Sequence, residues 1–298
     1  MQENMKIDLH IHSKASDGKM SVEEIFQEAR RRNIDLISIT DHDSLDSQES
    51  ALRASHQFKI DYLCGIELNV TYSHPDYKKG KSISLDFLGY HYDIHYLPLV
   101  EKLRELREYR ERRAEKILQN LNREFEKKNI EPFTTDDLRS IQAAVDGSFG
   151  RPHIADYLIK KGIVNNKQAA FDQYLVKCNV PKMPLSLADA SSLIHGAGGQ
   201  LFFAHPGHPR GTSMVSFTSS LDEQQKIIKE NMLDFIDGIE CWHSSYDEET
   251  SRSYLQFAKI HGLGVSGGSD CHQQPIIMGT TNVPENVAEQ FGFARHEQ

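Results

Sequence analysis

The sequence predicts an α/β fold in which strands form a barrel and a block of helices is inserted between the two barrel parts. Strand-like apolar runs alternate with helical patterns in residues 1–97 and again in residues 186–298, whereas residues 98–185 contain helical patterns only. The apolar runs repeatedly end on His, Asp or Glu, and active sites of α/β barrels lie at the carboxyl ends of the strands. We therefore expect a chemically active rim at one end of a barrel, next to an inserted helical cap domain.

The first barrel part, residues 1–97, contains four strand patterns and two helix patterns. Ser21 and Glu24 stand three residues apart before an apolar run, which is the spacing of a capping box at a helix start. The polar run Tyr72–Lys81 predicts an exposed hairpin loop. The expected strands are Lys6–His12, Leu36–Thr40, Tyr62–Val70 and Ser82–Tyr90, and the expected helices are Ser21–Arg32 and Ser47–His56.

The insertion begins with one long expected helix, Leu97–Asn129, in which acids and bases interleave and cancel each other. This pattern favours a solvated helix face over an arm that binds nucleic acid. Further helices are expected at Thr135–Ala144, Arg151–Lys161 and Asn166–Lys177. In the second barrel part, residues 186–298, the expected helices are Leu187–Gly196, Leu221–Asn231 and Glu248–His261, and the expected strands are Gln200–Ala204, Ile236–Cys241 and Gly264–Ser266.

The composition excludes several classes of protein. A chain of 298 residues with 26% charged residues and a net charge of −9 is typical of a globular protein and lacks the broad basic surface that coats DNA. The four cysteines form no CxxC pair, which favours a reduced, cytoplasmic interior. The N-terminus lacks the pattern of a signal peptide, and no run is apolar enough to span a membrane.

Histidines and acids collect in six short motifs at the ends of the expected strands. His10 and His12 stand two residues apart, so both imidazoles face the same side of a strand. One HxH pair is a weak signal, but six such motifs favour a metal cluster, because imidazole and carboxylate groups bind Mn, Fe or Zn. The motifs are LHIH followed by Asp17, ITDHD (Asp41, His42, Asp43), GIEL (Glu67), SLDFLGYH (Asp86, His91), FAHPGHP (His205, His208) and GGSDCH (Asp270, His272).

The same motifs, in this order, resemble those of the PHP (polymerase and histidinol phosphatase) phosphoesterases. The strings DLHIHSKASDG, ISITDHDSL, GIEL, FFAHPGHP and GSDCH carry the resemblance. The nearest branch includes RNase AM-type enzymes and nucleoside 3′,5′-bisphosphate phosphatases, and SFGRPHIADYLIKKG in the insertion resembles that branch as well. The resemblance implies a distorted (β/α)7 TIM-like barrel, the PHP fold, which holds two to three divalent metal ions.

The resemblance also implies a set of metal ligands. The first ion would be held by His10, His12, Glu67 and Asp270. Glu67 would bridge to a second ion, completed by His205 and Asp86, and the third ion would be held by Asp17, His42 and His272. The branch has a His at the place of Asp86, so an aspartate there adds negative charge; His91 is the alternative ligand. Asp270, His205 and His42 are the residues expected to act in catalysis.

Five further residues are candidates for binding the substrate phosphate. Arg151 starts a helix, where backbone N–H groups also favour anions, and its guanidinium matches phosphate geometry. His208 and Arg210 follow His205, while Lys182 is expected to be mainly a solvent-facing residue. His243 ends a strand, and its pattern fits a ligand or substrate contact as well as a structural role.

These observations predict a metal-dependent phosphoric ester hydrolase. A metal-activated hydroxide would attack the phosphate ester of a nucleotide-like substrate, either a nucleoside 3′,5′-bisphosphate or an oligonucleotide end. The open alternatives are a cyclic phosphate phosphodiesterase, a 5′-3′ exoribonuclease, an amide hydrolase with a similar barrel, and a PHP domain that binds metal without catalysis. The expected partner is a small phosphorylated molecule or a short RNA end, with no membrane partner. Asp41 is expected to orient an imidazole, and Asp43 to do the same or to cap the next helix.

Overall fold

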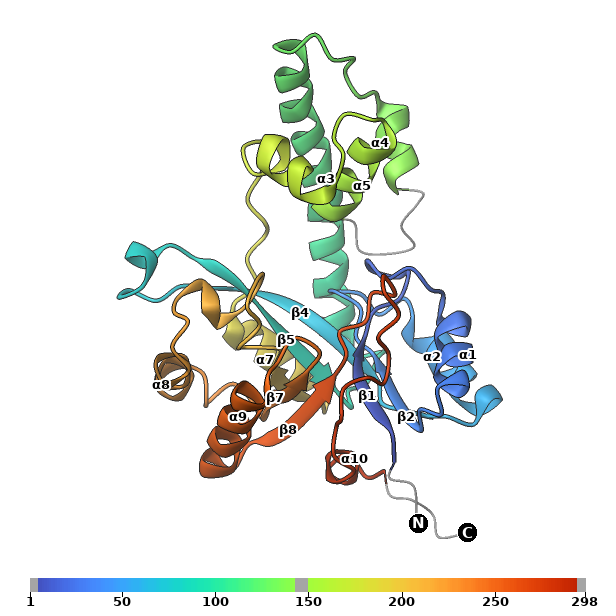
Figure 1. Cartoon of the computed structure of the whole chain (residues 1–298), viewed down its shortest axis with the longest axis vertical. Coiled ribbons are helices and arrows are strands. Elements are labelled where there is room, and N and C mark those ends of the chain that lie inside the picture. The colour runs from blue at the N-terminus through green and yellow to red at the C-terminus, as the bar shows by residue number, and fades with distance from the viewer. Residues whose placement is uncertain (1–4, 143–149, 294–298) are drawn as a thin grey trace.

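The structure of the chain is a computed structural model that describes residues 5–142 and 150–293. Its strands form two sheets whose ends meet at one rim (Figure 1). The first sheet is parallel and contains β1 (Ile7–Ile11), β2 (Leu36–Ile39) and β3 (Asp61–Tyr62). The second sheet has the order β4 (Gly65–Tyr72), β5 (Ile83–Tyr90), β6 (Gln200–Phe203), β7 (Gly238–His243) and β8 (Gly264–Gly268).

Two isolated β-bridges connect the sheets, one between Ile11 and Cys271 and one between His42 and Glu67. The mixed α/β class that we predicted is therefore confirmed. The described residues nevertheless form two sheets and not one continuous closed barrel.

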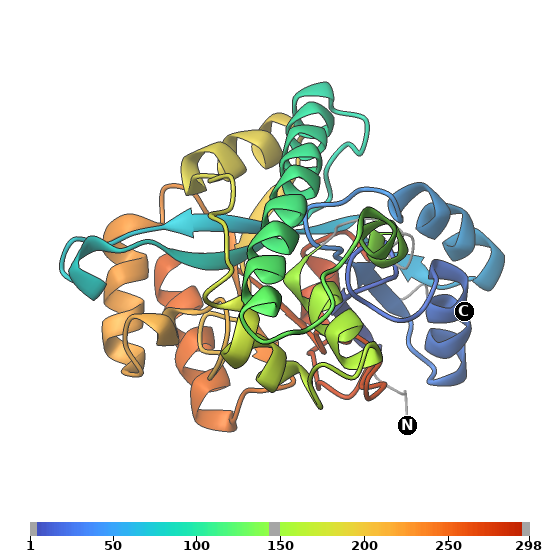
Figure 2. The ribbon, with the colours of Figure 1, turned by 90° about the horizontal axis from the view of Figure 1, so that it is seen from above.

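The second sheet is only partly parallel. β5 runs antiparallel to both of its neighbours, β4 and β6, whereas β6, β7 and β8 are parallel. The hairpin loop predicted over Tyr72–Lys81 is present between β4 and β5, and it makes them antiparallel, because a short loop reverses the chain directly and only a longer crossover can join parallel strands. The strands β4 and β5 make a long hairpin that projects from the body of the molecule (Figures 1 and 2).

Helices pack around the sheets at the places that the sequence predicts. α1 (Val22–Arg31) begins with the expected capping box: Ser21 Oγ accepts from the N–H of Glu24 at 3.3 Å, and the Glu24 carboxylate accepts from the N–H of Ser21 at 2.7 Å. One short helix near the C-terminus, Asn286–Glu289, was not predicted. The remaining helices of this part are α2 (Gln48–Phe58), α7 (Leu187–Gly196), α8 (Leu221–Asn231), α9 (Glu248–His261) and α10 (Asn286–Glu289). No helix among the described residues is long and apolar enough to cross a bilayer.

The inserted segment stands above the rim as a group of helices with a core of its own (Figure 1). Its longest member, α3 (Leu97–Glu126), packs Leu99 and Leu103 on the core of the larger sheet and Leu121 on the core of the inserted helices. The helix therefore connects the two cores and crosses over the sheets when the molecule is seen from above (Figure 2).

The shorter inserted elements follow the sequence prediction with two differences. They are α4 (Thr135–Gln142), α5 (Arg151–Lys160), α6 (Lys167–Ala170) and a π-helical turn, η2 (Phe171–Leu175). The helix expected over Asn166–Lys177 is thus divided into two kinds of turn. The last two residues of the helix expected over Thr135–Ala144 lie outside the described residues.

Candidate metal centre and anion pocket

The nine side chains predicted as metal ligands converge on the rim where the two sheets meet. They come from six segments that are distant in the sequence: His10 on β1, His12 and Asp17 just after it, His42 after β2, Glu67 on β4, Asp86 on β5, His205 after β6, and Asp270 and His272 after β8. Strands buried on both faces bring these polar groups into the interior, and His10 and His12 are 0% exposed.

Glu67 lies at the middle of the cluster. Its Oε2 atom is 3.5 Å from His10 Nε2, 3.2 Å from His12 Nε2 and 3.0 Å from His42 Nδ1. Its Oε1 atom is 2.9 Å from His205 Nε2. One buried carboxylate therefore faces four imidazoles, an arrangement that suits a bridging ligand between cations.

Two aspartates complete the cluster on the side of β8. Asp270 Oδ1 lies 3.1 Å from His12 Nε2 and 3.5 Å from both His10 Nε2 and His272 Nδ1. Asp17 Oδ1 lies 3.2 Å from His272 Nε2. The backbone carbonyl of Asp270 accepts a hydrogen bond from His272 Nδ1 at 3.0 Å, which leaves His272 Nε2 directed at Asp17.

Potential ligand atoms lie within 4.8 Å of one another in four groups. The group of Asp17, His42 and His272, joined by His12, agrees with the third ligand set that the family resemblance implies. Asp86 groups with His42 and Glu67, whereas His205 groups with His10 and Asp270. The geometry thus places Asp86 and His205 in separate groups and leaves Asp270 within reach of His205.

Five atoms of the cluster are buried without a hydrogen-bond partner, out of seven such side-chain atoms in the described part of the chain. Such an atom costs about 1–3 kcal/mol when nothing satisfies it. The five atoms are His10 Nε2, His12 Nε2, Asp17 Oδ1, Glu67 Oε2 and His205 Nδ1. All five belong to groups that coordinate divalent ions, so the residues present fit a metal centre.

The electrostatics of the cluster point the same way. Burial acts to lower the pKa of His12, but the carboxylates of Asp270 and Glu67 beside its Nε2 atom raise it to about 9. Burial opposes protonation of His42 as well, yet the charges of Glu67 and Asp17 raise its pKa to about 10. The pKa of Glu67 is held well below its ordinary value, against the effect of burial, by these histidines. Protons therefore balance the buried carboxylates in the metal-free chain, and bound cations would take their place.

Glu240, a buried acid on β7, holds two of the histidines and was missed by the sequence analysis. Its Oε1 atom accepts from His10 Nδ1 at 3.0 Å, and its Oε2 atom accepts from the backbone N–H of His205 at 2.7 Å. This contact directs His10 Nε2 toward Glu67 and Asp270, which is how carboxylates orient metal-binding imidazoles. An acid inside an otherwise apolar strand pattern was the signal in the sequence.

Asp41 and Asp43 do not play the roles that we expected. Asp41 accepts from the N–H and Oγ of Ser13, both at 2.7 Å, and from Ser16 Oγ at 2.6 Å, so it orders the loop before Asp17 and contacts no imidazole. Asp43 accepts from the N–H of Asn69 at 3.0 Å and pairs with Arg110. Asp43 does not cap α2, whose N-cap residue is Ser47.

The histidines considered beside the ligand set divide into two kinds. His243 lies at the centre: its Nε2 atom is 3.4 Å from Asp270 Oδ2, and its ring lies 5.4 Å from the ring of His205. His208 packs edge-on against both rings. His91, the alternative to Asp86, is exposed beyond the end of β5 and bonds to the carbonyl of Cys64 through its N–H. The prediction of His91 as a possible ligand was therefore wrong.

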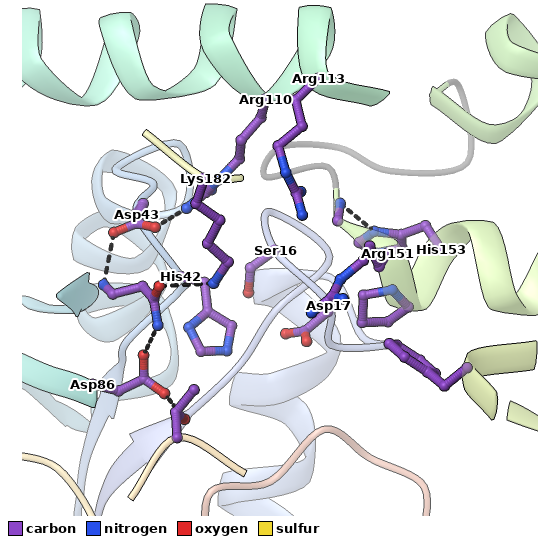
Figure 3. Close-up of a pocket in the computed structure, with 15 residues that line it drawn as sticks. Ser16, Asp17, His42, Asp43, Asp86, Arg110, Arg113, Arg151, His153 and Lys182 are labelled. Atoms are coloured by element: carbon purple, nitrogen blue, oxygen red, sulfur yellow. Dashed lines mark hydrogen bonds and ion pairs between the residues drawn. The ribbon is translucent and has the colours of Figure 1, made fainter. Parts of the chain in front are cut away.

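Two adjoining cavities open onto the cluster. One, of about 180 Å³, is lined by ligand residues together with His208 and Arg210. The other, of about 240 Å³, lies between the rim and the inserted helices and is lined by Arg110, Arg113, Arg151 and Lys182 (Figure 3). Both cavities share His42, Asp86 and Thr212 as lining residues.

The second cavity concentrates positive charge. Arg113 donates to the carbonyl of Val180 at 2.5 Å and to Asn179 Oδ1 at 2.7 Å. Lys182 Nζ donates to Asn69 Oδ1 at 2.7 Å (Figure 3). Within residues 5–142 and 150–293, no carboxylate forms a salt bridge with Arg113, Arg151 or Lys182. Burial lowers the pKa of Arg113 to about 10 and that of Lys182 to about 8. Arg110 pairs with Asp43, and Asp17, Asp43 and Asp86 also line this cavity. Arg113, Arg151 and Lys182, which form no salt bridge within the described residues, make its other side an anion pocket.

The sequence analysis found only half of this pocket. Arg151 and Lys182 were among the candidates, although Lys182 was expected to face mainly solvent. Arg110 and Arg113 lie in the charge-rich part of α3, which we expected to be a solvated face. Nothing in the sequence distinguishes these two arginines from their neighbours, because only the packing of α3 over the rim selects them.

A cluster of imidazoles and carboxylates at converging strand ends, beside an anion pocket, defines a class of metal-dependent enzymes that act on phosphorylated substrates. The family model of the PHP domain matches residues 8–177. The chain therefore belongs to the PHP domain family. A solved structure of a metal-dependent phosphoesterase from Bifidobacterium adolescentis, whose function carries the qualifier putative in its description, is 27% identical and has a TM-score of 0.78 over 97% of this chain and 96% of that chain.

Two curated relatives match most of the chain. A 5′-3′ exoribonuclease from Haemophilus influenzae is 28% identical over 90% of this chain and 90% of its own length. A 3′,5′-nucleoside bisphosphate phosphatase from Chromobacterium violaceum is 28% identical over 89% of this chain and 87% of its own length. The family and the branch that the motifs resemble are thereby confirmed.

Proposed function

We propose that this chain is a metal-dependent phosphoesterase that removes a phosphate from a nucleotide-like substrate carrying a second anionic group. The observation that carries the proposal is that two adjoining cavities share lining residues: one faces the predicted metal ligands, and the other is lined by Arg113, Arg151 and Lys182, which form no salt bridge within the described residues. The relatives named above act, by their descriptions, on a nucleoside bisphosphate and on RNA, and both substrates bear two phosphates close together.

The architecture that serves this function is a distorted barrel formed by residues 1–97 and 186–298, with residues 98–185 as a cap. The two sheets, joined by bridges at both edges, would act as the barrel wall, and the cap supplies Arg110, Arg113 and Arg151 to the substrate. Placing the cations on the cap and the ligands on the barrel makes a productive site depend on both parts.

Divalent ions fit the rim in the sets defined by the ligand groups. The residues that would hold them are His10, His12, Asp17, His42, Glu67, Asp86, His205, Asp270 and His272. When bound, Mn, Fe or Zn ions supply positive charge against phosphate oxygens and lower the pKa of a water that can attack phosphorus. Glu240 holds the imidazole of His10 through Nδ1, so that Nε2 stays available to an ion.

The remaining residues bind and orient the phosphates. His208 and Arg210 line the cavity at the ligand end and are placed to contact the phosphate that is cleaved. Lys182, Arg113 and Arg151 take the second phosphate, and the guanidinium groups match its oxygens in pairs. His243, held against Asp270, is placed to share a proton with that carboxylate.

The test is a substrate panel with the full chain loaded in turn with Mn, Zn and Fe. Release of phosphate from adenosine 3′,5′-bisphosphate is compared with that from adenosine 3′- and 5′-monophosphates, a 2′,3′-cyclic nucleotide and a 5′-phosphorylated RNA dinucleotide. One charged contact contributes about 1.5–3 kcal/mol, so we expect kcat/KM for substrates with two phosphates to be roughly 10-fold to 100-fold higher.

Variants and controls separate this proposal from its alternatives. Asp270→Asn should abolish phosphate release and lower the number of bound ions together. Arg113→Gln should remove the preference for two phosphates while turnover of the monophosphates persists. Equal kcat/KM for all phosphomonoesters would refute the second-anion pocket. A protein that binds ions but hydrolyses none of the phosphates would be a non-catalytic PHP domain, and turnover of an amide panel alone would favour the amide hydrolase.

A further inference from the structure

The hairpin of β4 and β5 ends in a basic tip that the phosphoesterase proposal does not use. Lys78, Lys79 and Lys81 stand at the tip, all exposed, and Asp76 is the one acid among residues 73–82. None of the three lysines forms a salt bridge within the described residues. A local excess of positive charge on a chain with a net charge of −9 attracts a polyanion to that place.

The backbone of the tip is unfavourable for lysine. Lys78 has a φ of 47° and Lys79 has a φ of 56°, both in the left-handed region that glycine and asparagine adopt most readily. Two successive side chains held in this region cost folding energy that asparagine would reduce, and such strain is concentrated at functional positions. The lysines are therefore better explained by a partner than by the stability of the turn.

The tip is linked to the active site in two ways. The strands that lead to it carry Glu67 and Asp86, so the hairpin starts at the rim and projects outward from it (Figures 1 and 2). The loop that follows His205 runs from the rim to the outer part of the hairpin: Thr212 donates to Asp86, and the ring of Phe217 lies 5.5 Å from that of Tyr77. Arg210 of this loop is exposed.

We propose that the lysine tip of the β4–β5 hairpin binds the 3′-continuing part of a single-stranded RNA whose 5′ end occupies the site at the rim. The proposal rests on the nucleotide-directed function given above. Lys81 precedes Asp86 by five positions of extended chain, about 17 Å, which corresponds to about five stacked nucleotides. Exposed lysines suit the phosphate backbone of a single RNA strand.

This geometry distinguishes short substrates from longer RNA chains. A mononucleotide bisphosphate, or a dinucleotide, fills the two cavities and cannot reach the tip. An octamer reaches both. The hairpin then raises affinity for longer RNA without changing the handling of the small substrate, because it contacts neither the cleaved phosphate nor the pocket for the second phosphate.

The experiment compares the full chain with a variant that carries Lys78→Asn, Lys79→Asn and Lys81→Gln. Asparagine accepts the left-handed backbone, so the variant should melt at the same temperature as the parent chain or higher. A matched control carries Lys226→Gln, Lys229→Gln and Lys259→Gln on α8 and α9, which removes the same charge from exposed helix positions. The probe is a 5′-phosphorylated, phosphorothioate-linked RNA octamer, with binding followed by fluorescence anisotropy in Mn buffer.

We expect the tip variant to bind the octamer about tenfold more weakly, and its salt dependence to fall by about 2 in the log–log slope, since each charge on a single strand contributes about 0.7. Its kcat/KM for adenosine 3′,5′-bisphosphate should stay unchanged, and the control should match the parent chain in both assays. An unchanged octamer affinity and salt slope would overturn the inference, as would an equal loss in the control.

Two further outcomes are distinguishable. If the tip variant loses binding to phosphatidylserine vesicles but not to the octamer, the partner is a membrane surface and the RNA inference is wrong. If the parent chain hydrolyses no phosphate ester yet binds the octamer through the tip, the phosphoesterase proposal fails while the hairpin inference stands.

Discussion

Replacement of Glu240 by Gln tests the support beneath the metal centre. The carboxylate accepts two hydrogen bonds, from His10 Nδ1 and from the N–H of His205, and it is 0% exposed. A glutamine offers one acceptor oxygen, so one of these donors would face an NH2 group. An unsatisfied buried donor costs about 1–3 kcal/mol, and loss of a carboxylate that orients a metal-binding imidazole typically lowers metal affinity about 10-fold to 100-fold.

Loss of Glu240 also weakens the competition between a proton and a metal ion for His10. This effect favours metal binding, but it is smaller than the loss of orientation. Burial opposes protonation of His10, whereas Glu240, Asp270 and Glu67 raise its pKa well above the ordinary value, so loss of Glu240 makes the proton easier to displace. A divalent ion carries twice the charge of a proton and loses more from removal of the same carboxylate. The expected net result of Glu240→Gln is therefore weaker metal binding by about 1.4–2.8 kcal/mol, which corresponds to 10-fold to 100-fold.

The assay is competition for Mn or Zn against a fluorescent chelator at pH 8, accompanied by thermal melting of the metal-free protein. Glu28→Gln is the matched control. Glu28 on α1 is 9% exposed, pairs with Arg31 and Arg32, and belongs to none of the four groups of potential metal ligands. The control should keep the metal affinity of the parent chain. Unchanged metal affinity in Glu240→Gln, with or without a lower melting temperature, would refute the role assigned to this residue.

Three further predictions concern protons, charge and ion number. Because burial lowers the pKa of Lys182 to about 8, its charge is lost as the pH rises through 8; kcat/KM for a bisphosphate should fall above that pH in the parent chain, and Lys182→Gln should be about tenfold lower at pH 7 and lack this fall. Metal loading at pH 7.5 should release about four protons, seen by calorimetry in buffers of different ionisation enthalpy, because the pKa values of His12, His42 and His205 lie at about 9 to 10 and that of His10 is raised well above its ordinary value. Asp86→Asn should bind one ion fewer by elemental analysis, and an unchanged ion count would exclude Asp86 as a ligand.

Much of the fold follows from short-range pattern. The boundaries of α7, α8 and α9 agree with the sequence prediction, and the Ser21–Glu24 box starts α1 as expected, because helical period and capping depend on residues within one or two turns. The predicted hairpin loop joins β4 and β5, but the antiparallel pairing of β5 with β6 was not predicted. Strand direction depends on which strands pair, and pairing is a long-range property.

The candidate ligands were also accessible to sequence analysis. A side chain at the end of a strand is placed by the strand, and parallel strands of an α/β sheet present their carboxyl ends at one edge, so His10, His42 and Asp270 could be expected to meet. Glu67 and Asp86 lie within β4 and β5, so this rule does not place them. Glu240 was missed because it lies inside β7 and not at the end of the strand, so the strand-end pattern of ligands did not select it.

The sequence by itself determined the family, the alternation of strands and helices, and the kinds of side chain at the strand ends, because each of these is a local pattern of residue types. Tertiary structure alone decided that two sheets meet at a rim and that Arg110 and Arg113 turn from a charge-rich helix into the pocket beside it. The physical reason is the same in each case. The packing of α3 and the pairing of the strands bring together residues that are far apart in the sequence, so a local pattern of residue types cannot show that they are close in space.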